Sequence, residues 1–231
     1  MREIAPHLYP FEGRFLDLGA VRMHYLDEGE GQPVVAVHGN PTWSFYWREL
    51  IRVFRDRYRV VAVDHIGCGL SGKPDVERYS YTLQQRIDDL GALIDKLDLQ
   101  RVTLVAHDWG GAIGLSSVLE RRERLHRIVL LNTGAFPPPY VPWRIAACRI
   151  PLLGTAAVRG LNAFARAAIT MAMSRNKLSP DVASGLLAPY DNWSNRVAID
   201  AFVRDIPMSK RHPTYPTLAD LESRLPSLSE T

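Results

Sequence analysis

The sequence predicts an α/β fold in which helices cover both faces of a mostly parallel sheet. Its 231 residues are 46% hydrophobic and 23% charged, a composition typical of one large globular domain. Continuous apolar runs suited to strands buried on both faces alternate with segments of helical periodicity. After Gly134 a segment with four prolines leads into a region of helix patterns without a strand pattern. We therefore expect a sheet core over residues 1–133, a helical cap over 134–215 and a return toward the sheet over 216–231.

The expected elements follow one another in order along the chain. Strand patterns at residues 15–18 and 22–26 flank a Gly19-Ala20 turn, which predicts an antiparallel hairpin. Further apolar runs predict buried strands at 33–38, at 58–63, from Val102 onward and at 127–131. Apolar residues at helical spacing predict helices at 43–54, 82–97 and 111–120, with a weaker one at 217–224.

The most informative motif joins the apolar run from Val102 to a helix pattern through Ala106-His107-Asp108-Trp109-Gly110. Small residues at Ala106 and Gly110 permit a tight strand-to-helix turn. Such a turn lifts its central residue, Asp108, above the sheet and beside backbone N–H groups at the start of a helix. A serine in that place needs a base, whereas an aspartate with an ordinary pKa near ~3.9 is already an anion at neutral pH. Asp108 is therefore the predicted nucleophile.

A second motif, His38-Gly39-Asn40-Pro41, directly follows the apolar run at 33–37. Carboxyl ends of neighbouring parallel strands meet at one edge of a sheet, so we expect this loop beside Asp108. Its backbone N–H groups, the Asn40 amide and the Trp109 indole are neutral donors suited to a developing anion. Taken alone, Asn40 before Pro41 is also an ordinary loop residue, and His38 could simply satisfy loop backbone. The two motifs together favour the functional interpretation.

These motifs resemble those of the haloalkane dehalogenase group of α/β-hydrolases, in which an asparagine and a tryptophan serve an aspartate nucleophile. The resemblance covers almost the whole chain through the segments 38–43, 64–71, 107–111, 130–133 and 159–164. The amino-acid sequences of segments 64–69 and 159–164 look most like those of a branch of β-lactone decarboxylases associated with olefin biosynthesis. The resemblance implies that Asp108 forms a covalent intermediate while Asn40 and Trp109 hold the departing charge, without a cofactor.

The cap and the site loops are expected to enclose an apolar substrate, either small or long-chain. The residues expected to line that pocket are His38, Gly39, Phe136, Trp143 and Phe164. Each apolar cap residue can equally belong to a core between helices. Neither Cys68 nor Cys148 stands in a metal-binding spacing, so we predict no metal.

The resemblance also implies residues that the sequence does not supply. Related enzymes complete their site with an acid and then a histidine, both after the nucleophile. Asn132 stands where some dehalogenases have the acid, and no Gly-His segment follows before Thr231. We expect a C-terminally shortened fold, without the last strands and helix, whose strand at 127–131 is an exposed apolar edge. The histidines weighed as substitutes were His38, His65, His107 and His212, and none is expected to have nucleophile–base geometry.

Several alternatives to a β-lactone decarboxylase remain open. One is true haloalkane hydrolysis, and another is a catalytically incomplete scaffold or partner subunit, because the acid and histidine are missing. Epoxide hydrolysis would need a cap tyrosine as proton donor, for which the candidates are Tyr140, Tyr190 and Tyr215. Ester hydrolysis is disfavoured because Asp108 replaces serine.

The remaining expectations concern partners and location. The net charge of +3 is scattered and accompanies no nucleic-acid-binding motif, so no nucleic acid partner is expected. No apolar run approaches the ~20 residues that span a bilayer, and the N-terminus has no signal-peptide core. These features predict a cytoplasmic protein, which we expect could form a complex with other enzymes of its pathway.

Overall fold

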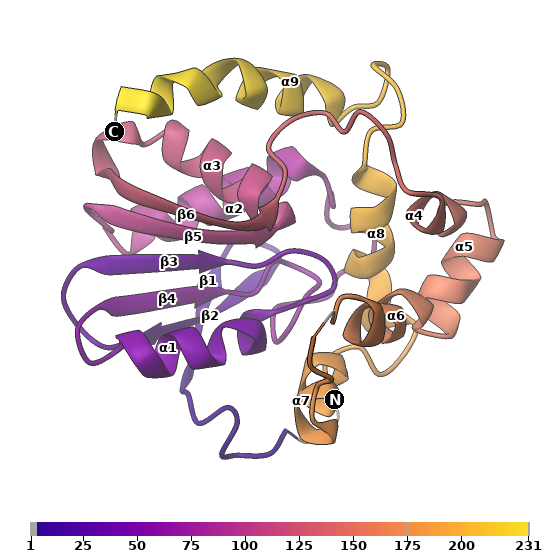
Figure 1. Cartoon of the computed structure of the whole chain (residues 1–231), viewed down its shortest axis with the longest axis horizontal. Helices are drawn as coiled ribbons and strands as arrows, with labels where there is room; N and C mark the ends of the chain where they lie inside the picture. The colour runs from indigo at the N-terminus through magenta and orange to yellow at the C-terminus, as the bar shows by residue number, and fades with distance from the viewer. Residues whose placement is uncertain (1–3, 174, 231) are drawn as a thin grey trace.

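The computed structural model describes residues 4–173 and 175–230, which form one layered α/β structure (Figure 1). Residues 1–3, and Thr231 of the predicted return segment, lie outside the described residues.

Six strands form one sheet in the order β1-β2-β4-β3-β5-β6. β1 pairs with β2, and β2 with β4, in antiparallel fashion, whereas β4, β3, β5 and β6 are parallel. The strands span β1 (Gly13–Asp17), β2 (Arg22–Glu28), β3 (Pro33–Val37), β4 (Arg59–Val63), β5 (Val102–Asp108) and β6 (Leu125–Thr133). The predicted hairpin and the mostly parallel sheet are confirmed.

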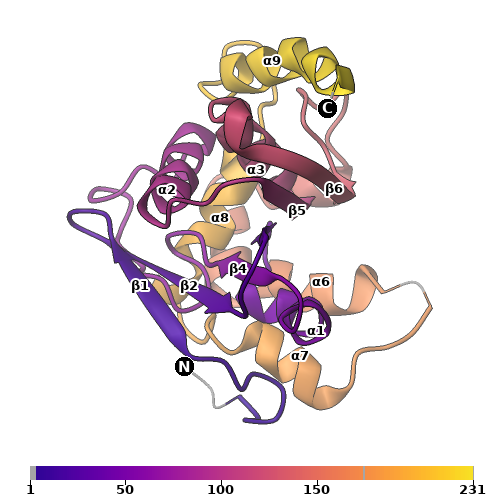
Figure 2. The ribbon, with the colours of Figure 1, turned by 90° about the vertical axis from the view of Figure 1, so that its left-hand side faces the viewer.

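Successive strand residues pack on opposite faces of the sheet, which explains the continuous apolar runs. Val35 and Val37 of β3 belong to the core beneath α2 (Leu83–Lys96) and α3 (Trp109–Leu119). Val34 and Ala36 pack instead on the face covered by α1 (Arg48–Phe54). Figure 2 shows α2 and α3 on one side of the sheet and α1 on the other.

The described residues after β6 form helices and no further strand. Helices α4 to α8 lie at the end toward which the parallel strands point, and α9 returns over α3 (Figure 1). Their bounds are α4 (Trp143–Ala147), α5 (Leu153–Thr155), α6 (Ala163–Met171), α7 (Pro180–Leu187), α8 (Val197–Asp205) and α9 (Tyr215–Arg224). Short helical turns occupy Ser44–Trp47, Arg122–Arg124, Ala156–Gly160, Ser194–Arg196 and Leu225–Glu230.

β6 forms one edge of the sheet, as the sequence predicts. Val129, Leu130 and Leu131 in this strand are each more than 40% exposed. None of the helices in the described part of the chain combines the length and apolarity needed to cross a bilayer.

Candidate functional site

Asp108 occupies a strained turn between β5 and α3. Its backbone has φ +54° and ψ −130°, a conformation that residues other than glycine rarely adopt and that is concentrated at functional sites. A Cβ atom at Gly110 would lie 2.1 Å from the Val37 carbonyl oxygen, and one at Gly111 only 1.8 Å from Thr133 Oγ1. The turn therefore depends on the small residues that follow Asp108.

Two backbone N–H groups hold the Asp108 carboxylate. The Asn40 N–H donates to Oδ1 at 2.7 Å, and the Trp109 N–H at the start of α3 also donates to the carboxylate. Gly39 makes this approach possible, because a Cβ there would lie 2.1 Å from Oδ1. Burial raises the pKa of Asp108 above its ordinary value, although both N–H groups act in the opposite direction. The geometry leaves a desolvated carboxylate fixed by the donors that form an oxyanion hole in related folds.

The side chains of Asn40 and Trp109 lie around the same turn but contact the cap. Asn40 Nδ2 donates to the Ile199 carbonyl oxygen of α8 at 3.2 Å, and its buried Oδ1 has no partner among the described residues. The Trp109 indole packs against Phe202 of α8, with ring centroids 5.8 Å apart. The three predicted residues are thus brought together, with the Asn40 amide turned toward α8.

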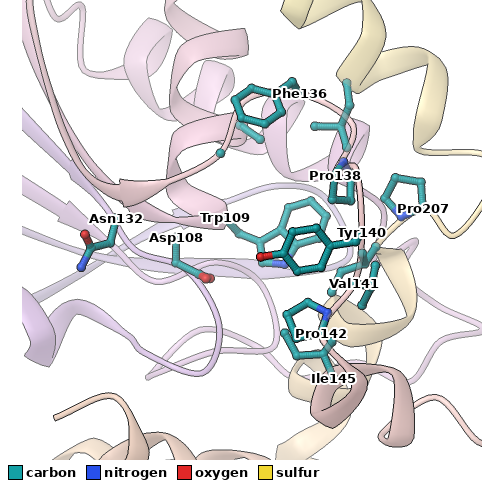
Figure 3. Close-up of a pocket in the computed structure, with 14 residues that line it drawn as sticks. Asp108, Trp109, Asn132, Phe136, Pro138, Tyr140, Val141, Pro142, Ile145 and Pro207 are labelled. Atoms are coloured by element: carbon teal, nitrogen blue, oxygen red, sulfur yellow. The ribbon is translucent and has the colours of Figure 1, made fainter. Parts of the chain in front are cut away.

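The Asp108 carboxylate and the Trp109 ring line an apolar pocket of about 210 Å³ (Figure 3). The other walls come from the proline-rich segment after β6, from α4, and from Ile206 and Pro207 after α8. Tyr140 lines the pocket with its hydroxyl on the side of Asp108. Such a lining suits an apolar ligand with few polar groups.

Of the residues expected to line this pocket, Phe136 does so and four others do not. His38 is fully buried beneath the loop, and Gly39 abuts Asp108 from the side of the sheet. Trp143 is 75% exposed, and the α4 residue that lines the pocket is Ile145. Phe164 packs against a separate cluster in which cap residues meet Trp43 and Phe45.

The tyrosines proposed for epoxide opening are also separated by the structure. Tyr190 is buried and its hydroxyl donates to the Thr42 carbonyl oxygen at 3.1 Å. Tyr215 begins α9 and is not part of the pocket lining. Tyr140 is the one of the three that lines the pocket, although it is 76% exposed.

Sequence reasoning did not identify Asp64, the fully buried carboxylate that organises the neighbouring loops. Its Oδ1 accepts from the Ser44 N–H at 2.6 Å, and its Oδ2 accepts from the Leu70 N–H and from His24 Nδ1, both at 2.8 Å. Burial alone would raise the pKa of Asp64, but His24, His38 and the Leu70 N–H together leave it below its ordinary value. The sequence signals were its position after a buried strand and its place in the segment 64–71 that carries the resemblance, and neither gave Asp64 a role.

The described histidines do not hydrogen-bond to the Asp108 carboxylate. His107 stacks on Tyr46 with ring centroids 4.8 Å apart. His38 Nε2 accepts from the His65 N–H, while His65 Nε2 donates to the His38 carbonyl oxygen. Burial lowers the pKa of both residues, so this pair is neutral and holds the loop in place. His212 bonds to backbone groups of the tail and of Arg204.

The structure also places Asn132, the residue at the position of the acid in some dehalogenases. Asn132 is the residue before the last of β6 and lines the pocket, with its amide pointing away from Asp108 (Figure 3). Within the described ranges, no group of three or more histidine, cysteine, aspartate or glutamate side chains is arranged to hold a metal ion.

Comparisons with known proteins agree with this architecture. Residues 32–151 match the family described as the alpha/beta hydrolase fold. A cis-3-alkyl-4-alkyloxetan-2-one decarboxylase from Shewanella oneidensis is 44% identical over 227 residues, covering 96% of this chain and 71% of that protein. A protein of the same name from Xanthomonas campestris pv. campestris is 42% identical over 234 residues, covering 96% and 78%.

Solved structures agree as well. The haloalkane dehalogenase DatA from Agrobacterium tumefaciens superposes with a TM-score of 0.79 at 30% identity, covering 90% of this chain and 72% of that chain. The haloalkane dehalogenase DbeA from Bradyrhizobium elkani gives a TM-score of 0.83 at 25% identity, covering 94% and 77%. The chain therefore belongs to the α/β-hydrolase family of enzymes, in the group that contains haloalkane dehalogenases and oxetanone decarboxylases.

Proposed function

We propose that Asp108 attacks a carbon atom of an apolar substrate and that the favoured reaction is decarboxylation of a cis-3,4-dialkyl-oxetan-2-one, a β-lactone. The observation that carries this proposal is the Asp108 carboxylate itself, held by the N–H groups of Asn40 and Trp109 while it lines an apolar pocket. The two relatives named as oxetanone decarboxylases support this substrate class.

In the first step, an oxygen of Asp108 bonds to C4, the alkyl-bearing ring carbon that is attached to the ring oxygen. The bond between that carbon and the ring oxygen breaks, and its electron pair leaves on the new substrate carboxylate. The Trp109 indole N–H and the Asn40 amide N–H that is not bonded to the Ile199 carbonyl oxygen are the neutral donors that we assign to this anion. The chain and the opened substrate are then joined through an ester.

In the second step, the bond between the substrate carboxylate and its carbon breaks, and that electron pair forms the double bond. The ester C–O bond breaks at the same time and returns its pair to Asp108. One oxetanone gives one alkene and one carbon dioxide, and no water is consumed. Attack opposite the leaving oxygen sets the ester and the carboxylate in an antiperiplanar arrangement, so a cis oxetanone gives a cis alkene.

Haloalkane hydrolysis is the second candidate, favoured by the likeness to haloalkane dehalogenase structures. Its first step expels a halide in the same way, but its second step adds water to the ester. That step needs a base, and no described histidine hydrogen-bonds to Asp108. We therefore expect a bromoalkane to lose bromide as its alkyl group bonds to Asp108, and the resulting alkyl ester to remain.

The two candidates are separated by the products of matched substrates. We expect the chain to convert a cis-dialkyl oxetanone to cis alkene over many turnovers, and to release at most about one bromide per chain from a 1-bromoalkane. Asp108→Asn is the control and should abolish both. Alkene production that survives Asp108→Asn, or repeated bromide release without alkene formation from the oxetanone, would reject the decarboxylase proposal.

A further inference from the structure

The corner between α4 and α5, residues 142–154, carries large apolar side chains that the fold leaves exposed. Trp143 is 75% exposed, Ile150 48%, Leu152 86% and Leu153 71%. Single exposed apolar side chains are ordinary, but this many in one short segment mark an interaction surface. We call this segment the cap corner.

The cap corner is anchored, so its exposed side chains are not those of a loose end. Arg149 Nη1 donates to three carbonyl oxygens at the end of α8, those of Val203, Arg204 and Ile206, at 2.6, 2.7 and 2.9 Å. Leu152 has φ +63°, in the left-handed region that favours glycine. The Leu152 side chain is almost fully exposed, so its packing within the chain does not explain the strained backbone.

The charge around the cap corner identifies the partner. Residues 142–154 contain Arg144 and Arg149 and no aspartate or glutamate. Arg144 is exposed beside Trp143, with its guanidinium carbon 5.5 Å from the ring centroid. A tryptophan and two leucines, in a segment with two arginines and no acid of its own, complement the surface of an anionic bilayer.

The cap corner is also continuous with the pocket. Pro142 and Ile145 line the pocket, while Trp143 between them is exposed. Figure 1 shows α4 and α5 at the right-hand side of the molecule, with the sheet on the left. We propose that the cap corner inserts into the surface of an anionic phospholipid bilayer, so that an apolar ligand reaches the pocket from the lipid phase.

Co-sedimentation of the full chain with phosphatidylcholine vesicles, with and without phosphatidylglycerol, tests this proposal. We expect binding to the vesicles that contain phosphatidylglycerol, weakened by added salt. The variant Leu152→Asn with Leu153→Ser should bind about tenfold more weakly, because two buried leucines are lost from the bilayer contact. Leu152 and Leu153 are 86% and 71% exposed, so this variant should fold normally, which its thermal melting checks.

A matched control replaces two exposed valines elsewhere on the surface. Val53→Ser with Val76→Ser removes aliphatic side chains that are 68% and 65% exposed, and should leave vesicle binding unchanged. Failure of the unsubstituted chain to bind, or binding that survives the Leu152 and Leu153 substitutions, would overturn the proposal. So would a protein dimer that these substitutions abolish, because the partner would then be a protein. Vesicle binding needs no turnover, so its result is independent of the chemistry proposed for Asp108.

Discussion

At the scale of the residue, Asp108 is buried where the fold disfavours its ionised carboxylate. Burial raises its pKa, and the N–H groups of Asn40 and Trp109 offset this only in part. Its backbone is strained at the same time. A residue that is unfavourable in both respects is best explained by reactivity, because nucleophilic sites trade stability for a reactive group.

This cost predicts how Asp108→Asn changes stability with pH. The folded state holds the Asp108 proton more tightly than the unfolded chain does. Rising pH therefore removes stability between the unfolded and the folded pKa of this carboxyl. Asp108→Asn has no such group, so at neutral pH it should raise Tm by about 2–4 °C, the shift that ~1 kcal/mol gives for a chain of this size.

Thermal unfolding of both proteins across a pH series checks this. The higher Tm of Asp108→Asn should be present at neutral pH and vanish below the pKa that aspartate has in the unfolded chain. A variant that is less stable than the unsubstituted chain at neutral pH would show that the carboxylate stabilises the fold.

At the scale of the element, a buried ion pair ties α8 of the cap to α2 of the core. Arg86 Nη1 lies 3.3 Å from Asp205 Oδ2, and both side chains are buried. The Arg86 guanidinium also lies 3.6 Å from the ring centroid of Phe202, the α8 residue that packs on Trp109. The position of α8, and with it one wall around Trp109, depends on this contact.

Removing one partner of the pair should be costly. We expect Asp205→Ala to lower the free energy of unfolding by about 3–5 kcal/mol, because it leaves the Arg86 charge buried without its counterion. Asp220→Ala, which breaks the exposed pair with Arg224 in α9, is the matched control and should cost less than about 1 kcal/mol.

Urea unfolding of the two variants measures the difference, and the double variant Arg86→Met with Asp205→Leu should recover most of the loss. Equal losses for Asp205→Ala and Asp220→Ala would mean that the buried pair does not hold the cap to the core.

At the scale of the whole molecule, local patterns in the sequence predicted the sheet core and the turn at Asp108. The continuous apolar run of β3 and the small residues around Asp108 are local features, readable without a structure. The prediction that Trp143 lines the pocket was wrong, because α4 has only five residues and its periodicity cannot define which side faces inward. Asp64 was not found because its partners His24, Ser44 and Leu70 meet only in the folded chain.

The measurement that tests the central claim most directly is the mass of the chain after reaction with a 1-bromoalkane, followed by peptide mapping. Nucleophilic attack by Asp108 predicts one alkyl group per chain, carried as an ester on the peptide that contains Asp108 and absent from Asp108→Asn. An unmodified Asp108 peptide, or the same alkylation in Asp108→Asn, would contradict the assignment of Asp108 as the nucleophile.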